Sequence, residues 1–288
     1  MTSSLLRPRG RARTTSGGTP VGMPVGSVPE GSTAPTRILD WRDPRVAALV
    51  RELGAAGPVD PVAPVDFADH ADAARRIEAL HRAHAWIAAA VRPVYSVQDE
   101  RPVSEVLRLG RGSCSQRLAV LESVARAYGV PTRVRGLLVD GAFWYPRFPR
   151  LRRIVPDQVL LAWPEFRLGS PAGAGGAAAS WLTVSQLLGG MRPGGGEHGG
   201  TPGGGFTNAG SETLFEALSR TAIDWDAAPA ACPGTGPGAG TACDLSAYVL
   251  SDLGHHDSRD ELFARHGQTL CGLARLVAEP VLGRRGAA

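Results

Sequence analysis

The sequence predicts an α+β fold, because stretches with helical periodicity and stretches typical of β-strands occur in separate blocks of the chain. Apolar residues recur at three- and four-residue steps in residues 66–91 and 114–128. Three strand-like runs follow, at residues 132–141, 155–166 and 180–188. The remaining C-terminal part of the chain is predicted to be mostly helical.

Composition divides the 288 residues into parts with different expectations. Residues 1–35 are rich in Ser, Thr, Gly, Pro and Arg and lack an apolar period, so we expect a disordered N-terminal tail. A glycine-rich loop is expected at residues 189–205. A core domain is therefore expected at residues 36–188 and a helical C-terminal region at 206–288, and the hydrophobic content of 43% suffices for a packed core.

The charge and hydropathy of the chain argue against several classes of function. The net charge is +4, and the 31 basic residues are all dispersed arginines, so nucleic-acid binding is not expected. No apolar run approaches the ~18 residues of a membrane span, and the N-terminus lacks the apolar segment of a signal peptide. Four cysteines in this length do not form a disulfide framework, so we expect a cytoplasmic protein with reduced thiols.

The first predicted elements are helices. A short helix is expected within residues 38–53, after an Asp-Pro step. The clearest helix covers residues 66–91, and Asp66 or Asp69 is expected to cap it. Another short helix, over residues 103–109, precedes a glycine-rich turn.

The next helix begins at a cysteine. In GRGSCSQRLAVLESVARAYGVPTRV, Ser113 or Cys114 opens a helix that continues through Tyr128 and ends at a Gly-Val-Pro turn. A thiol becomes a nucleophile when its pKa falls, and the free N–H groups of a helix N-terminus favour the thiolate. Arg111 and Arg117 add positive charge nearby. The alternative is a small, inert residue at a helix start, which is the usual role of a lone cysteine.

The strand-like runs are joined by segments of different character. Residues 142–153, AFWYPRFPRLRR, interleave aromatic residues and arginines, which indicates either a substrate-facing loop or a hairpin whose aromatic residues pack inward. Beyond the glycine-rich loop, helices are expected within residues 211–225 and 243–282. Asp257 or Ser258, followed by Glu261, is typical of a helix start.

The order of these elements resembles the transglutaminase-like superfamily of cysteine enzymes. The resemblance covers about residues 74–188 and rests on SEVLRLGRGSCSQRLAVLESVARAYGVPTRVRGLL. There, as in the family, a Gly-x-Cys cysteine opens a helix, a Gly-Val-Pro turn closes it and a strand follows. The resemblance implies a papain-like α+β core in which the helix that begins at Cys114 packs on an antiparallel sheet.

The resemblance also implies a histidine and an aspartate near the cysteine, and this sequence has other residues at those places. Asp157 (or Gln158) takes the place of the histidine, and Ser185, after Trp181, takes the place of the aspartate. The resemblance therefore makes Cys114 the nucleophile and Asp157 an altered catalytic partner. An ordinary aspartate, with a pKa near 3.9, is a weak base for a thiol, and its charge close to sulfur disfavours the thiolate.

Three alternatives follow from this departure. In the first, a histidine from elsewhere enters the site, namely His255 or His256 oriented by Asp257 or Asp260, although the capping pattern favours an exposed loop there. In the second, Asp157 acts as acid and base in a reaction that does not begin with a free thiolate. In the third, the fold binds a peptide or a carrier protein without catalysis.

Candidate metal sites have less support. His81 and His84 lie on one helical face, but no third ligand is fixed by spacing, so a helix surface is favoured over a metal pair. Cys232, Cys243 and Cys271 lack the CxxC spacing of zinc sites, so packing is favoured over zinc binding. We therefore expect neither a cofactor nor a metal ion.

The function that the sequence favours is a cysteine-dependent acyl-transfer or amide-processing enzyme, acting on a peptide, amide or acyl substrate. The excess of Ala, Gly, Pro and Arg over Lys indicates a GC-rich genome and is consistent with a bacterial specialised pathway. The alternative is a catalytically altered transglutaminase-like module that binds a peptide or a partner protein. No membrane association is expected, and the oligomeric state is left open.

Overall fold

The structure is a computed structural model that describes most of the predicted core and part of the C-terminal region. The described residues are 29–55, 70–148, 152, 155–168, 180–188, 208, 213–219, 223, 225, 245–269 and 279. Residues 1–28, the glycine-rich loop, the predicted caps at Asp66 and Asp69, and three of the four cysteines lie outside them. No helix in the described part of the chain is long and apolar enough to cross a membrane.

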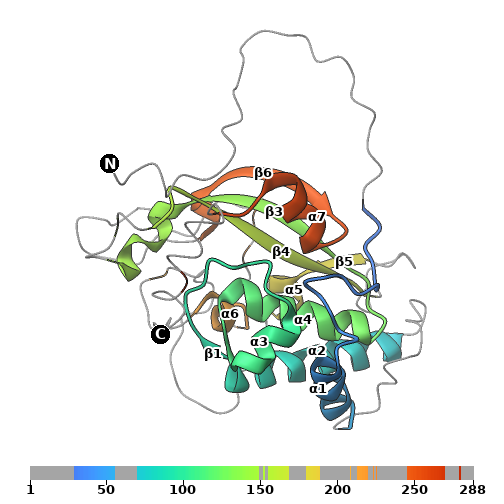
Figure 1. Ribbon diagram of the computed structural model, residues 1–288. Helices are drawn as coiled ribbons and strands as arrows, with labels where there is room; N and C mark the ends of the chain where they lie inside the picture. The colour runs from blue at the N-terminus through green and yellow to red at the C-terminus, as the bar shows by residue number, and fades with distance from the viewer. Residues whose placement is uncertain are drawn as a thin grey trace, which may run out of the picture.

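Four helices form one layer of the molecule (Figure 1). They are α1 (Pro44–Ala55), α2 (His70–Ala90), α3 (Val103–Leu109) and α4 (Cys114–Ala127). Helix α4 lies at the centre of this layer, and every residue after its first two is buried. The helix that the sequence predicts to open at the cysteine is therefore the core helix of the fold.

An antiparallel sheet forms the second layer. Among the described residues its strand order is β5-β4-β3-β6, with β3 at Thr132–Asp140, β4 at Gln158–Leu168, β5 at Ser180–Thr183 and β6 at Val249–His256. The register pairs Thr132 with Phe166 and Asp140 with Gln158. The predicted α+β class and its three strand-like runs are confirmed, since β3, β4 and β5 lie within or largely within those runs.

Short elements connect the two layers. They are the parallel pair β1 (Arg92–Pro93) and β2 (Arg111–Gly112), the turn of 3-10 helix η1 (Gly141–Arg147), α5 (Val184–Leu188), α6 (Leu214–Ala217), η3 (Leu245–Tyr248) and α7 (Arg259–His266). Ser258 caps α7 by accepting a hydrogen bond from the amide of Glu261, as the capping pattern predicts.

The helical prediction for residues 243–282 is wrong at residues 249–256, where β6 forms instead. This segment completes the sheet by pairing with β3, and the register shifts twice along the pair. Leu250 is 50% exposed, and Gly254 has a φ of +80°, a conformation that favours glycine. Backbone hydrogen bonds to a distant strand therefore decide the structure of this segment, and local sequence patterns do not report such bonds.

Residues 29–35, the end of the predicted tail, lie along the edge of the core. Ser32 forms an isolated bridge with Thr132, the first residue of β3. The amide of Gly31 donates to Asp257, just before α7, at 3.0 Å. The segment before α1 thus joins the sheet and the C-terminal region.

A buried ion pair ties α7 to α4. The Nε of Arg259 lies 2.5 Å from Oε1 of Glu122, and the two side chains are 1% and 0% exposed. The guanidinium also donates to Ser115 at 3.0 Å and to the carbonyl of Ala162 in β4 at 3.4 Å. Because buried charges are tolerated only when paired and hydrogen-bonded, this contact fixes α4, β4 and α7 relative to one another.

Breaking this pair from one side is expected to be costly. Arg259→Met leaves the Glu122 carboxylate buried without its cation, and we expect the free energy of unfolding to fall by about 3–5 kcal/mol in urea denaturation. The double variant Arg259→Met/Glu122→Leu removes both charges and is expected to recover most of the loss. A double variant no more stable than Arg259→Met would contradict this account.

Candidate active site

Cys114 is the first residue of α4 and is partly exposed. Gly110 ends α3 with a φ of +58°, a left-handed conformation that lets the chain reverse toward α4. Ser113 then caps α4, because its hydroxyl accepts from the amide of Gln116 at 3.2 Å. The side chain of Gln116 accepts in return from the amide of Ser113 at 3.0 Å. This reciprocal cap orients the first turn of α4.

The first amides of α4 are available to a ligand. Within the described residues, the backbone N–H groups of Cys114 and Ser115 make no hydrogen bond. Unpaired N–H groups at a helix N-terminus attract anions and developing negative charge. The thiol therefore lies beside two donors that are able to stabilise an oxyanion.

A cavity of about 170 Å³ opens beside Cys114. One wall comes from the residues after β1, including Val94 and Tyr95, and another from the start of β4, including Val159 and Leu161. A third wall comes from η1 and the residues that follow it, because Trp144, Arg147 and Phe148 all line the space. In the described part of segment 142–153, Phe143 packs into the core, whereas Trp144, Arg147 and Phe148 face the cavity.

Arg117 places a buried guanidinium one helical turn from Cys114. Its side chain lies 4.3 Å above the ring of Phe215, and it donates to the carbonyl of Ala88 and the hydroxyl of Thr213, each at 3.3 Å. In the described part of the chain no carboxylate lies within 4.0 Å of it, and its Nε has no hydrogen-bond partner. Burial lowers the pKa of Arg117, whereas charge on Cys114 and Glu216 raises it. A thiolate at Cys114 would therefore stabilise the cation.

The two histidines of α2 anchor other elements. Nε2 of His84 lies 2.8 Å from the carbonyl oxygen of Phe215, and the two rings stack at 4.2 Å. Nε2 of His81 lies 2.7 Å from the carbonyl oxygen of Leu187. No cluster of three potential metal ligands occurs among the described residues. These contacts give both histidines a structural role, attaching α6 and α5 to α2.

Neither Asp157 nor Ser185 lines the cavity beside Cys114. Asp157 is exposed just before β4, where its carbonyl accepts from the amide of Gly141 at 2.9 Å, and it does not line the cavity. Ser185 is buried in α5 and donates its hydroxyl to the carbonyl of Ile223 at 2.9 Å. The residues at the places of the family histidine and aspartate, Asp157 and Ser185, are therefore not part of the cavity beside Cys114.

His255 and His256 also lie away from the cavity. They pair with Arg135 and Val134 near the start of β3, whereas the cavity lies beyond the end of β3, at η1. Nε2 of His255 is 3.2 Å from Glu165, and the ring of His256 is buried 5.4 Å from that of His266. Neither histidine lines the cavity, so the structure does not support an imidazole from β6 at the thiol.

Several cavity residues were not singled out by the sequence. The Nε of Arg147 donates to Asn208 at 2.6 Å, and Asn208 donates to the carbonyl of Phe143, also at 2.6 Å. Burial raises the pKa of Tyr95, although the neighbouring Arg147 guanidinium opposes this. The interleaved aromatic and arginine residues of segment 142–153 were the signal for Arg147. Asn208 and Tyr95 carry no comparable local pattern.

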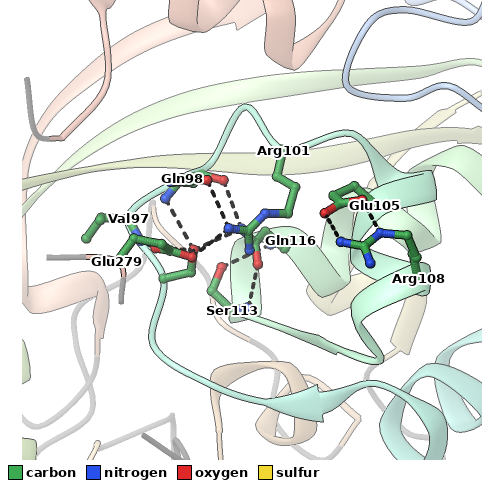
Figure 2. A network of polar contacts seen from close by, with 9 residues as sticks. Val97, Gln98, Arg101, Glu105, Arg108, Ser113, Gln116 and Glu279 are labelled. Carbon is green, nitrogen blue, oxygen red and sulfur yellow. Dashed lines mark hydrogen bonds and ion pairs between the residues drawn. The ribbon is translucent and has the colours of Figure 1, made fainter. Parts of the chain in front are cut away.

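A polar network connects residues 96–101 to the cap of α4 (Figure 2). The carboxylate of Glu279 accepts from the hydroxyl of Ser96 at 2.9 Å, from the amide of Val97 at 3.1 Å and from Arg101 at 2.7 Å. The side-chain amide of Gln116 donates to Ser96 at 3.0 Å. Gln116 also forms the cap of α4. The carboxylate of Glu279 is therefore connected, through the side chains of Ser96 and Gln116, to the first turn of α4, where Cys114 lies.

The central part of the chain matches one known protein family. Residues 66–185 match the model of a family described as the transglutaminase-like superfamily. The matched segment contains α2, α3, α4, β3, β4 and Cys114. Searches among curated proteins and among solved structures found no match. The resemblance inferred from the residues around Cys114 is thereby confirmed.

The Glu279 contact is expected to contribute measurably to stability. Both partners in its ion pair with Arg101 are 12% exposed, so we expect Glu279→Ala to lower the free energy of unfolding by about 1–3 kcal/mol. Glu105→Ala is a matched control, because its ion pair with Arg108 is much more exposed and should change stability by less than about 0.5 kcal/mol. Equal losses in urea denaturation of the two variants would contradict the assignment.

The burial of His84 predicts a pH dependence of stability. Burial depresses the pKa of His84, so below about pH 6.5 the unfolded chain binds a proton that the folded chain does not. The stabilisation is complete above that pH and is lost as the pH falls toward the folded-state pKa. We expect His84→Gln to show a smaller loss of unfolding free energy than the wild type between about pH 7 and pH 5. If His84→Gln and the wild type lose the same unfolding free energy between these pH values, this account of His84 is wrong. His266→Gln tests the separate contribution of His266, whose pKa burial also lowers.

Proposed function

Because residues 66–185 match the model of the transglutaminase-like superfamily, we propose that this protein is a cysteine-dependent acyl-transfer or amide-processing enzyme with Cys114 as its nucleophile. The observation that carries the proposal is the position of the thiol. Cys114 lies at the N-terminus of a buried helix, lines a cavity, and is one turn from a buried arginine without a carboxylate partner among the described residues.

Each part of this arrangement supports one step of acyl transfer. The helix N-terminus and Arg117 favour negative charge on the sulfur before attack. When Sγ bonds to the acyl carbon, the carbonyl oxygen becomes an oxyanion, and the free amides of Cys114 and Ser115 are available as donors to it. The C–N or C–S bond to the leaving group then breaks, and an amine that leaves takes a proton from solvent. An acceptor attacks the resulting thioester, loses its proton to solvent and releases Cys114 as the thiolate.

The proposal assigns the charge beside the thiol to Arg117 and gives no role to Asp157. Proton transfer requires hydrogen-bond contact or one intervening water, whereas Asp157 is exposed and does not line the cavity that contains Cys114. The buried guanidinium acts as a fixed counter-charge and does not need to exchange protons at neutral pH.

Alkylation with iodoacetamide tests the nucleophile. Cys114 is expected to react faster at neutral pH in the folded protein than in urea-unfolded protein, as measured by site-resolved mass spectrometry. We expect Arg117→Met to slow this reaction about tenfold at neutral pH, because one nearby opposite charge is lost. Arg108→Met removes the same formal charge from an exposed side chain and is expected to leave the rate unchanged.

The same experiment separates the enzyme from the binding module. If Cys114 in the folded protein reacts no more readily than in unfolded protein, the nucleophile assignment fails, and peptide or partner binding becomes the better account. If Arg117→Met and Arg108→Met slow the reaction equally, Arg117 has no specific role at the thiol.

A further inference from the structure

We propose that the acyl donor is a thioester with an apolar acyl chain, which is bound in the cavity beside Cys114. This inference rests on the proposed function and narrows its substrate class. Two independent observations carry it, namely the hydrocarbon surface of the cavity and the weak proton donors that line it.

The cavity presents mostly hydrocarbon to a bound group. Its walls include Val97, Trp144, Phe148, Val155 and Val159, which come from three separate segments of the chain. The ring of Tyr95 packs against Phe148, with centroids 4.6 Å apart, and continues the same surface. An aliphatic or aromatic acyl chain therefore gains burial here, at about fourfold in affinity per buried methylene.

Charged groups are few on this surface. Among the described residues, the charged side chains that line the cavity are Asp99 and Arg147. Arg147 is held by Asn208 at 2.6 Å, which is in turn held by the carbonyl of Phe143. A charged acyl chain would lose its hydration against the hydrocarbon walls, which is strongly unfavourable for a charge that does not reach Arg147.

The proton donors of the cavity favour a particular leaving group. No imidazole lines the cavity in the described part of the chain, and Tyr95 keeps its proton tightly because burial raises its pKa. An amine expelled from an amide must be protonated as it leaves. A thiol, with an ordinary pKa of about 8.5, leaves as a thiolate without such help. The cavity is therefore better suited to thioesters than to amides.

The proposed steps balance without a further reactant. Sγ of ionised Cys114 bonds to the thioester carbon, the donor C–S bond breaks, and the donor thiol leaves as a thiolate. An acceptor amine then attacks the Cys114 thioester, the new C–N bond forms, the Cys114 C–S bond breaks, and the amine proton passes to solvent. No electron is transferred to an external oxidant or reductant.

The test compares four small acyl donors on the full-length protein. They are the N-acetylcysteamine thioesters of acetate, hexanoate and succinate, together with the matched N-alkyl amide of hexanoate. Acylation of Cys114 is followed by the mass increase of its peptide. We expect the hexanoyl thioester to react at least about tenfold faster than the acetyl thioester. The succinyl thioester and the hexanoyl amide are expected to be slower still.

A cavity variant makes the binding assignment specific. Val159→Phe fills space at the start of β4, so we expect the ratio of hexanoyl to acetyl rates to fall about tenfold. Leu250→Phe changes an exposed residue of β6 and is expected to preserve the ratio. Because the readout is a ratio between two donors, a general loss of folded protein does not mimic it.

The outcomes distinguish this inference from the proposed function. If succinyl thioester or hexanoyl amide acylates Cys114 as fast as hexanoyl thioester, the substrate class is wrong, while the nucleophile assignment stands. If no thioester acylates Cys114 although iodoacetamide reacts preferentially with it, the substrate class is likewise overturned. Failure of both reagents at Cys114 overturns the proposed function itself.

Discussion

Complete burial of α4 is the constraint on which the rest of the structure depends. This helix carries Arg117, Glu122 and Arg126 inside the core, and each charge needs partners there. Arg259 neutralises Glu122, and Arg126 donates to Thr132 and to two carbonyl groups from distant segments. The helix is therefore held in one position between α2, α7 and the sheet, and its first turn has a defined orientation toward the cavity.

Arg117 is satisfied less completely than its neighbours on α4, and this difference connects packing to chemistry. Its two hydrogen bonds are 3.3 Å long, and the remaining stabilisation comes from the face of Phe215. His84 stacks on Phe215 as well. The same aromatic ring thus anchors α6 to α2 and carries the cation that lies one turn from Cys114, so loosening α6 would also move that charge.

The sequence predicted what is encoded locally and failed where distant segments decide the structure. The turn, cap and helix around Cys114 lie within a few residues, and the family pattern and the structure agree on them. The strand-like runs at residues 132–141 and 155–166 likewise predicted β3 and β4. The pairing of β6 with β3 depends on a partner about 115 residues away, and a family register that placed Asp157 at the thiol took no account of how β4 begins. The hydrogen bonds of Glu279 could not be predicted from the sequence, because a single carboxylate forms no periodic pattern.

The network around Glu279 has a consequence for the order in which the site is assembled. Ser96, which donates a hydrogen bond to the Glu279 carboxylate, precedes Glu279 by 183 residues. The amide of Gly31 donates to the side chain of Asp257, which lies 226 residues later in the chain. During synthesis, the loop beside the thiol is made early but acquires its last hydrogen bonds only when the distal segment has emerged. Such long sequence separations slow folding, because the loop entropy is lost before the contacts form. The thiol therefore reaches its final environment late in the life of the nascent chain, after the helices around it have already been made.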